Sequence, residues 1–204
     1  MKLLLFSDVH CDLKQCQVLV ELAEKEDVDF VIGAGDFANF RRGLEPTIEI
    51  LSQISRPTIV VPGNSESDDE LLTACQAWPA ATVLHGSGTT VNGVDFWGIG
   101  GGIPVTPFGP WSFDFTEAQA ELMLAGCPAG SVLVTHSPPR GAVDVSSGGR
   151  SLGSIAIRET ILARQPRLVV CGHIHESAGQ HEMIGPTPVV NAGPRSMVWE
   201  LQAH

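Results

Sequence analysis

Residues 2–10 read KLLLFSDVH: an apolar run from Leu3 to Phe6 stops at Ser7, and Asp8 and His10 follow it. A short apolar run that ends in small polar residues is typical of a buried strand that runs into a loop. In an extended stretch, residues two positions apart point the same way, so Asp8 and His10 can present two polar side chains from one turn. The segment therefore predicts a buried strand with polar, reactive side chains at its carboxyl end.

The first half of the chain repeats this kind of strand, with helices between the copies. Asp12 is expected to cap a helix over residues 13–25, in which apolar residues form one stripe and charged residues form the opposite face. Further strands are expected at residues 28–32 and 58–61, and a second helix at residues 44–54. Strands that alternate with helices in one sheet are parallel and are joined by right-handed crossovers.

The second half of the chain is richer in β-structure. The expected elements are strands at residues 82–84, 89–91, 94–99, 131–135 and 167–171, helices at 116–124 and 153–163, and short β segments near Glu182, Val189 and Val198. Asn92-Gly93 is a hairpin signal between two of these strands. Because no repeat and no long linker divides the chain, residues 1–204 are expected to form one α/β domain, with two mixed sheets flanked by helices.

Polar side chains stand at the end of each buried strand. They are Asp8, His10, Asp36, Asn64, His136, His173 and His175. Open α/β sheets bind ligands at the carboxyl ends of their strands. Glycine precedes Asp36, Asn64 and His173, which allows tight turns and close approach of the backbone. We expect these side chains to converge on one edge of the fold and to bind metal.

The chemistry of these donors indicates which metals they prefer. Imidazole, carboxylate and amide ligands without thiolate favour Mn, Fe, Co, Ni or Zn over Ca or Mg. This chemistry does not choose among the five metals, and Mn is our first expectation. Two divalent ions about 4 Å apart repel each other strongly unless an anion lies between them. Asp36, alone on its loop, is the natural bridging carboxylate. Asp36 would therefore suit the position between two divalent metal ions.

The order of the polar motifs carries a resemblance. DVH, GDF, GNSE, THS and GHIH follow one another between residues 8 and 175, and together they resemble the calcineurin-like metallophosphoesterase family over nearly the whole chain. The stretches THSPPRG and GHIHES are similar to those of compact bacterial phosphodiesterases of the Icc-related branch. The resemblance implies a four-layer αββα sandwich. It also implies one ion held by Asp8, His10, Asp36 and His175, and a second ion held by Asp36, Asn64, His136 and His173.

The third motif departs from the family pattern. Its common form is GNH followed by Asp or Glu, whereas Ser65 stands at the histidine position here and Glu66 follows it. In the family that histidine contacts the phosphate and protonates the leaving oxygen, and serine is not a strong acid at neutral pH. Loss of a positioned proton donor lowers a rate by roughly 10²- to 10⁴-fold, so esters with good leaving groups are favoured. The departure argues against a protein Ser/Thr phosphatase, and Glu66 is expected to orient a ligand rather than to bind metal.

The resemblance implies metal-dependent hydrolysis of a small phosphate diester, by in-line attack of a hydroxide that bridges the two ions. Asp36, Asn64 and Ser65 are expected to act at the reacting centre, and Arg140, on the loop after His136, to neutralise a substrate oxygen. A non-catalytic adaptor with the same fold is the alternative, although such adaptors typically lose some of the histidine ligands. A nuclease of the DNA-repair branch fits less well, because the chain is short and acidic and lacks the GNH motif.

Composition limits the partners and the compartment. The chain has 12 lysines plus arginines and 23 aspartates plus glutamates, a net charge of −11 that repels phosphate backbones, so duplex nucleic acid is not expected as a partner. Its five cysteines are odd in number and contain no C-x-x-C pair, which favours a reducing cytoplasm. No apolar run approaches the roughly 18 to 20 residues that span a bilayer, so no membrane partner is expected. The oligomeric state and the natural substrate stay open.

Other patterns in the sequence are less specific. Three histidines match no motif and are expected at the surface or in structural roles: His85, His181 and His204. Gly33-Ala34-Gly35 begins a formal match to the dinucleotide pattern G-x-G-x-x-A, but Asp36 would place a carboxylate where a pyrophosphate must sit. Three aromatic residues are expected either to line the cleft or to pack the core of their loop: Phe108, Trp111 and Phe113.

Overall fold

Alternate residues of the first strand face two different apolar clusters. The computed structural model describes residues 1–202, so His204 lies outside the described part of the chain. In β1 (Lys2–Phe6), Leu3 and Leu5 pack between two β-sheets, whereas Leu4 and Phe6 pack against helices. Since successive side chains of a strand point to opposite faces, a strand that is apolar throughout is buried on both sides.

Two mixed sheets form the centre of the fold. After β1, the strands are β2 (Phe30–Gly33), β3 (Thr58–Val60), β4 (Ala81–Val83), β5 (Ser87–Val91), β6 (Val94–Ile99), β7 (Val132–Thr135), β8 (Leu168–Cys171), β9 (His181–Ile184), β10 (Thr187–Asn191) and β11 (Met197–Glu200). The first sheet has the order β11-β1-β2-β3-β4, and the second has the order β5-β6-β7-β8-β10-β9. Neighbouring strands are parallel except at three edge strands, β11, β5 and β9, which pair antiparallel.

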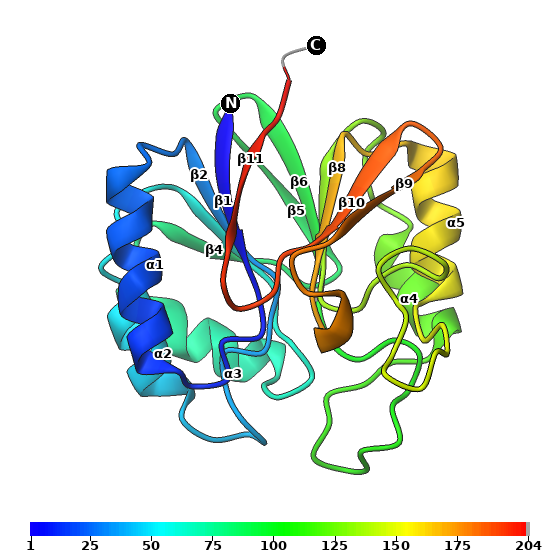
Figure 1. Cartoon of the computed structure of the whole chain (residues 1–204), viewed down its shortest axis with the longest axis horizontal. Coiled ribbons are helices and arrows are strands. Elements are labelled where there is room, and N and C mark those ends of the chain that lie inside the picture. Colours follow the sequence, from blue (N-terminus) through cyan, green and yellow to red (C-terminus); the bar gives the residue numbers. More distant parts are fainter. Residues whose placement is uncertain (203–204) are drawn as a thin grey trace.

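Helices cover the outer face of each sheet. They are α1 (Leu13–Lys25), α2 (Leu44–Leu51), α3 (Asp68–Ala74), α4 (Glu117–Leu124) and α5 (Ile155–Arg164). The first three pack on the first sheet and the last two pack on the second, on opposite sides of the molecule in Figure 1. An apolar cluster fills the space between the sheets. The four layers are therefore α/β/β/α, which confirms the expected architecture.

The strongest local signals in the sequence are confirmed with little change. α1 has the expected bounds, and the side chain of Asp12 accepts hydrogen bonds from the backbone N–H groups of Lys14 and Gln15. β5 and β6 pair antiparallel around Asn92-Gly93. Both residues of that turn have positive φ, +51° and +76°, as a tight hairpin turn requires.

Two helices differ from the sequence predictions. The predictions miss α3, although Ser67 and Glu70 form a capping box at its start, which is a recognisable sequence signal. α2 ends at Leu51 rather than at residue 54. The chain turns there, because the N–H of Ile54 donates to the carbonyl oxygen of Leu51 over 3.0 Å. Strand bounds shift by one or two residues: β2 is Phe30–Gly33 rather than residues 28–32, and β4 is Ala81–Val83 rather than residues 82–84.

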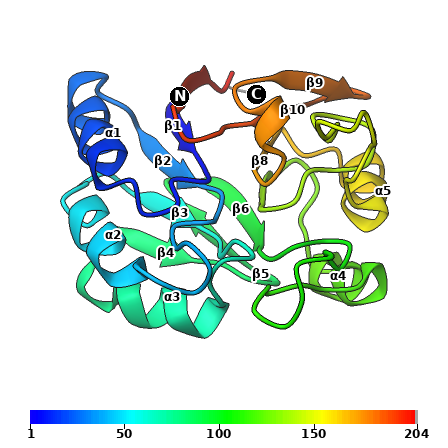
Figure 2. The same cartoon turned by 60° about the horizontal axis from the view of Figure 1, so that its bottom comes forward.

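The carboxyl ends of the central strands gather at one edge of the molecule. β1 runs from the N-terminus towards the bottom of Figure 1, where the loops that follow the strands collect. Figure 2 turns this edge towards the viewer and shows loops from both sheets lying next to one another. The two sheets therefore present their strand-end loops to a common region.

Candidate metal centre

Main-chain hydrogen bonds join the strand-end loops to one another. The N–H of His10 donates to the carbonyl oxygen of Asp36 over 3.0 Å, which links the loops after β1 and β2. The N–H of Gly172 donates to the carbonyl oxygen of His136 over 2.9 Å, which links the loops after β8 and β7. The backbone thus fixes the relative positions of residues that lie far apart in the sequence.

Four polar residues of these loops have left-handed backbone conformations. The φ angles are +55° for Asp8, +41° for His10, +56° for Asp36 and +67° for His173. This conformation disfavours a residue with a Cβ by roughly 1–2 kcal/mol. Strained residues of this kind cluster where the surrounding structure must aim side chains at a functional site.

The first group of metal-ligating atoms comes from Asp8, His10 and His175, all within 4.8 Å of one another. The Nε2 atoms of His10 and His175 are 3.2 Å apart, and His175 Nε2 is 3.6 Å from Asp8 Oδ1. Two imidazole nitrogens and a carboxylate oxygen that face one point are a suitable set of ligands for a divalent transition metal.

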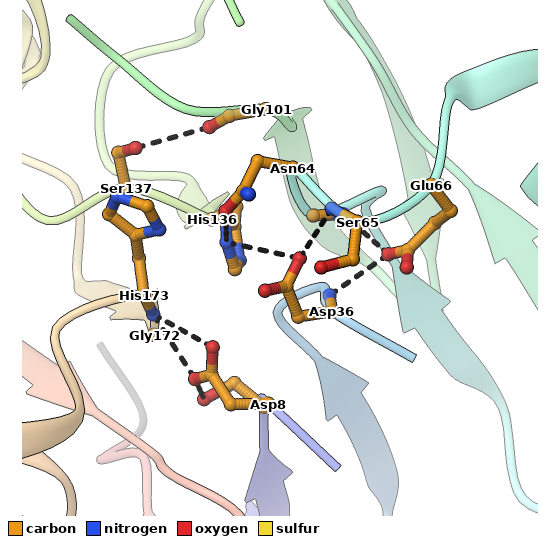
Figure 3. Close-up of polar contacts among 12 residues, drawn as sticks. Asp8, Asp36, Asn64, Ser65, Glu66, Gly101, His136, Ser137, Gly172 and His173 are labelled. Carbon is orange, nitrogen blue, oxygen red and sulfur yellow. Dashed lines mark hydrogen bonds and ion pairs between the residues drawn. The ribbon is translucent and has the colours of Figure 1, made fainter. Parts of the chain in front are cut away.

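The second group comes from Asp8, Asp36 and His136, which are all buried and also lie within 4.8 Å of one another. His136 Nε2 is 3.4 Å from Asp36 Oδ1 and 3.2 Å from Asn64 Oδ1. The other oxygen of Asp36, Oδ2, is 3.5 Å from His10 Nε2. Asp36 therefore has one oxygen directed at each group; Figure 3 shows its contact with His136.

His173 lies beside the second group rather than within it. Its ring centroid is 5.0 Å from that of His136, at an interplanar angle of 65°, and its backbone N–H is 3.1 Å from both carboxylate oxygens of Asp8. Burial, and then the charge of His136, lower the pKa of His173 to about 4. A neutral imidazole is the form that binds metal, so His173 retains the protonation state of a ligand.

The tautomers of two histidines fit bound cations. His10 Nδ1 is 3.1 Å from the carbonyl oxygen of Ala38, and His136 Nδ1 is 2.8 Å from the carbonyl oxygen of Ala34. A carbonyl oxygen only accepts hydrogen bonds, so in each neutral ring Nδ1 carries the proton. The lone pair of each Nε2 then points into the site, which is the arrangement found in metal-binding histidines.

The charges in the site keep Asp8 ionised and favour a positively charged species, either a proton on a histidine or a bound cation. Burial raises the pKa of Asp8, but the imidazole of His175 at 3.6 Å, the charge of His136 and a hydrogen bond from Ser7 together lower it to about 2. The nearby carboxylate of Asp8 raises the pKa of His175. Burial lowers the pKa of His136, but the carboxylates of Asp36 and Asp8 raise it to a net value above the ordinary one. A bound cation would take the place of these protons.

Glu66 holds the backbone of the loops that carry the ligands. Its buried carboxylate accepts hydrogen bonds from the N–H groups of Asp36 at 2.9 Å, Ala38 at 2.9 Å and Gly63 at 2.6 Å. Burial and then the charge of Asp36 raise its pKa to about 7. A Cβ on Gly63 would lie 2.0 Å from Asp36 Oδ1, so only glycine fits. Glu66 positions the site, as expected, but does so through main-chain contacts (Figure 3).

Asn64 is oriented by a pair of residues that the sequence analysis missed. Its Nδ2 donates to Ser112 Oγ over 3.2 Å, and Ser112 Oγ donates to Asp114 Oδ1 over 2.7 Å. With Nδ2 engaged, Oδ1 of Asn64 faces His136. Ser112 and Asp114 belong to a long loop with no strand-end motif, so only their contacts with Thr106 and Asn64 in the folded chain reveal the role.

Asn191 supports the turn between His173 and His175 and was also missed. Its Nδ2 donates to the carbonyl oxygens of Gly172 at 3.1 Å and Ile174 at 2.9 Å. Asn191 ends β10, which lies beside β8 in the same sheet. A polar residue at the end of an apolar strand is the signal that located the other site residues, and it applies here too.

Five of the candidate ligands line a cavity of about 640 Å³: His10, Asp36, Asn64, His173 and His175. Asp8 and His136 are not among the residues that line it. Ser65 also lines it, and its backbone N–H donates to Asp36 Oδ1 over 2.8 Å. Arg140 does not line it: its side chain is exposed, so the predicted contact with a substrate oxygen has no support in the geometry. Phe108 and Trp111 line the cavity, whereas Phe113 packs against Phe115 at a centroid distance of 4.8 Å.

Residues 1–202 match the profile of the calcineurin-like phosphoesterase superfamily domain. The chain belongs to the calcineurin-like phosphoesterase superfamily. The superfamily is one of metal-dependent phosphoesterases, a class of hydrolases. The two groups of ligand atoms described above are consistent with that dependence on metal.

Curated relatives in the superfamily include proteins of very different length. Metallophosphoesterase domain-containing protein 1 of Homo sapiens is 37% identical over 136 residues, which cover 64% of this chain and 38% of that protein. An uncharacterized protein of Methanocaldococcus jannaschii is 30% identical over 182 residues, which cover 84% of this chain and 80% of that protein. The match thus spans about two fifths of the length of the human relative.

Solved structures of the superfamily share the fold. The protein TT1561 of Thermus thermophilus superposes with a TM-score of 0.77 at 21% identity, over 98% of this chain and 99% of that one. A dimetal phosphatase from Danio rerio superposes with a TM-score of 0.61 at 14% identity, over 94% and 86% of the two chains. Among residues 1–202, no helix has the length and apolar character needed to cross a membrane.

Proposed function

We propose that this chain is a phosphodiesterase with two divalent metal ions, Mn²⁺ being the first choice, and that it hydrolyses a small phosphate diester. The observation that carries the proposal is the position of Asp36. Its Oδ1 lies 3.4 Å from Nε2 of His136, and its Oδ2 lies 3.5 Å from Nε2 of His10. A carboxylate with one oxygen toward each of two histidines is suited to bridge two cations and to reduce their repulsion.

The proposed ligands divide between two ions. One ion would be held by Asp8, His10, Asp36 and His175, and the other by Asp36, Asn64, His136 and His173. When bound, such ions polarise phosphoryl oxygens and lower the pKa of water. The protein itself orients these ligands, through Ala34 and Ala38 for the histidines and through Ser112 for Asn64.

Two features of the cavity favour a diester over a monoester. Its lining includes no lysine or arginine among the described residues, so the chain adds no cationic side chain to hold extra phosphate charge. A monoester carries about −1.5 to −2 charge at pH 7, whereas a diester carries a single negative charge. In addition, Ser65 lines the cavity where a histidine would donate a proton, which favours esters whose leaving group departs without one.

The net charge and the cysteines of the chain support a proposal for its partner and its compartment. We propose a small phosphate ester, and not duplex nucleic acid or a membrane, because the chain has a net charge of −11. The five cysteines are free thiols, in line with a reducing cytoplasm. We assign no role to Arg140, which is exposed and away from the cavity lining.

Hydrolysis of bis(p-nitrophenyl) phosphate and of p-nitrophenyl phosphate by the Mn²⁺-loaded chain tests the proposal. The diester should be hydrolysed faster, and Asp36→Asn should lower the rate by more than about 100-fold, the upper range for residues that merely orient a ligand. Asp95→Asn, at an exposed position of β6, is the matched control and should leave the rate unchanged. No Mn²⁺-dependent turnover, or full activity in Asp36→Asn, would overturn the proposal; faster hydrolysis of the monoester would overturn its diester part.

A non-catalytic adaptor remains the alternative function. Copurification with a partner, together with no turnover in the presence of metal, would indicate this function. The presence of all four candidate histidine ligands favours the enzyme, since an adaptor has no need to retain them: His10, His136, His173 and His175.

A further inference from the structure

Part of the wall of the cavity that the candidate ligands line is apolar and aromatic. It is formed by Phe40, Val105, Phe108, Trp111 and Leu152. Phe40 is 61% exposed and Phe108 is 50% exposed, although both are large apolar side chains. The loop that carries Phe108 and Trp111 projects from the strand-end edge and is the green loop at the bottom of Figure 1. Exposed apolar surface at the mouth of a site indicates a surface that a ligand covers.

Three rings of this wall pack against one another. Phe108 and Trp111 are nearly parallel, with an interplanar angle of 13° and a centroid distance of 5.7 Å. Phe40 meets Trp111 at 61° and 4.7 Å. We name these three residues the aromatic wall. Their mutual contacts hold the rings in place, and all three residues line the cavity.

Hydrogen bonds within the loop that carries Phe108 and Trp111 fix its conformation. The carboxylate of Asp114 accepts from Thr106 Oγ1 at 2.6 Å and from Ser112 Oγ at 2.7 Å. The N–H of Phe113 donates to the carbonyl oxygen of Asn64 over 3.0 Å, so the loop is attached to a candidate ligand. A wall that is ordered before binding avoids much of the entropy lost when a ligand orders it.

The size and charge of the cavity identify the occupant. Its volume of about 640 Å³ lies within the range of pockets for small organic ligands, roughly 300–1,000 Å³, and exceeds what a phosphate group needs. Apart from the candidate ligands, Glu176 is the only charged residue that lines it among those described. The remaining space therefore suits an uncharged group and disfavours a second phosphate.

We infer that the substrate carries a planar, uncharged aromatic group, which stacks on the aromatic wall while its phosphate lies at the candidate metal ligands. This inference rests on the proposed function, which supplies the phosphate position. Aromatic stacking adds attraction beyond the burial of apolar area, so a planar ring gains more from this wall than an alkyl chain of similar size.

Binding of simple phosphate monoesters to the Mn²⁺-loaded chain, measured by calorimetry, tests the inference without relying on turnover. Phenyl phosphate should bind about tenfold more tightly than methyl phosphate and several-fold more tightly than n-hexyl phosphate. Trp111→Ala should reduce the phenyl-to-methyl ratio to about two, and Trp111→Phe should preserve most of it. Leu122→Ala, at a 79% exposed apolar position on α4, is the matched control and should not change the ratio.

The outcomes separate the inference from the proposed function. Equal affinity for phenyl and methyl phosphate, or an unchanged ratio in both Trp111→Ala and Phe108→Ala, would overturn the inference even if diesters are hydrolysed. Equal affinity for phenyl and n-hexyl phosphate would show a merely apolar site and would also overturn it. A phenyl preference without any hydrolysis would instead overturn the proposed function alone.

The same calorimetric measurement with adenosine monophosphate identifies the kind of aromatic group. Tighter binding than that of phenyl phosphate assigns the wall to a nucleobase, and weaker binding assigns it to a small aryl group.

Discussion

The Nε2 atoms of His10 and His175 lie 3.2 Å apart, although 165 positions separate the two residues in the sequence. His10 Nδ1 faces the carbonyl oxygen of Ala38, so its Nε2 presents a lone pair to His175. Two imidazole nitrogens at this distance share either a proton or a cation. Protons and metal ions therefore compete for the same position.

We predict that acid releases the bound metal. Because the carboxylate of Asp8, 3.6 Å from His175 Nε2, raises the pKa of His175, the metal-free site takes up protons readily as the pH falls. Metal content should be complete at about pH 8 and fall below half at about pH 5, measured by elemental analysis after equilibrium dialysis. His175→Ala should lose about one metal ion per chain at both values. His181 is an exposed histidine on β9, and the control variant His181→Ala should behave like the native chain. A metal content that does not depend on pH would contradict the competition between protons and metal ions.

Glu66→Gln should change how the stability of the metal-free chain depends on pH. The pKa of Glu66 is raised to about 7 in the folded chain, above its ordinary value of 4.5, so the folded state favours the protonated form. The free energy of unfolding should therefore fall as the pH rises from about 4.5 to 7, by about 3 kcal/mol from this group. Urea unfolding in a chelator should show a smaller fall in Glu66→Gln.

The other carboxylate with a large shift titrates in a separate range. The pKa of Asp8 is lowered from 3.8 to about 2, so it contributes stability above pH 3.8 that is lost as the pH falls through about 2. The site histidines are present in both proteins, so the comparison isolates Glu66. Parallel pH profiles for the native chain and Glu66→Gln would show that this carboxyl is ionised throughout the range.

Ser65→His should raise the rate on esters with poor leaving groups. Ser65 lines the cavity, and its contact with Asp36 is made by the backbone N–H, which the substitution retains. A positioned acid typically adds roughly 10²- to 10⁴-fold, so we expect a gain of at least about tenfold on alkyl esters and little change on p-nitrophenyl esters. The dependence of kcat on leaving-group pKa should become shallower. Ser65→Asn fills similar space without an acid; an equal gain in that variant would refute proton donation.

Ser112→Ala should lower kcat by about tenfold and leave KM nearly unchanged. Without Ser112 Oγ, the amide of Asn64 loses the acceptor that keeps its Oδ1 directed at His136. Loss of such an orienting contact typically weakens metal affinity or activity by about 10- to 100-fold. Calorimetric titration with Mn²⁺ should show one weakened site, and Ser112→Thr should restore it. Ser52→Ala, whose hydroxyl donates to the carbonyl oxygen of Glu49 and which does not line the cavity, is the control. Two unweakened sites in Ser112→Ala would rule out this role.

Strand-end motifs made most of the site predictable. Asp8 and Asp36 each follow an apolar run and a glycine or serine, so local sequence alone assigns them to strand ends. Ser112 and Asp114 carry no such signal, because they reach Asn64 only through the folding of a long irregular loop. Arg140 follows a motif residue closely, but its side chain is exposed and is not among the residues that line the cavity, so its predicted contact with a substrate oxygen stays a prediction.

The sequence by itself determined the succession of strands and helices and the identity of the polar strand-end residues, because periodicity and local turn chemistry act over a few neighbouring positions. Tertiary structure alone decided which atoms face each other, such as the two oxygens of Asp36 toward His10 and His136. It also decided that Phe40 and Trp111, from different loops, share one wall. These relationships depend on how loops from two sheets are joined, and no short stretch of residues encodes that distance.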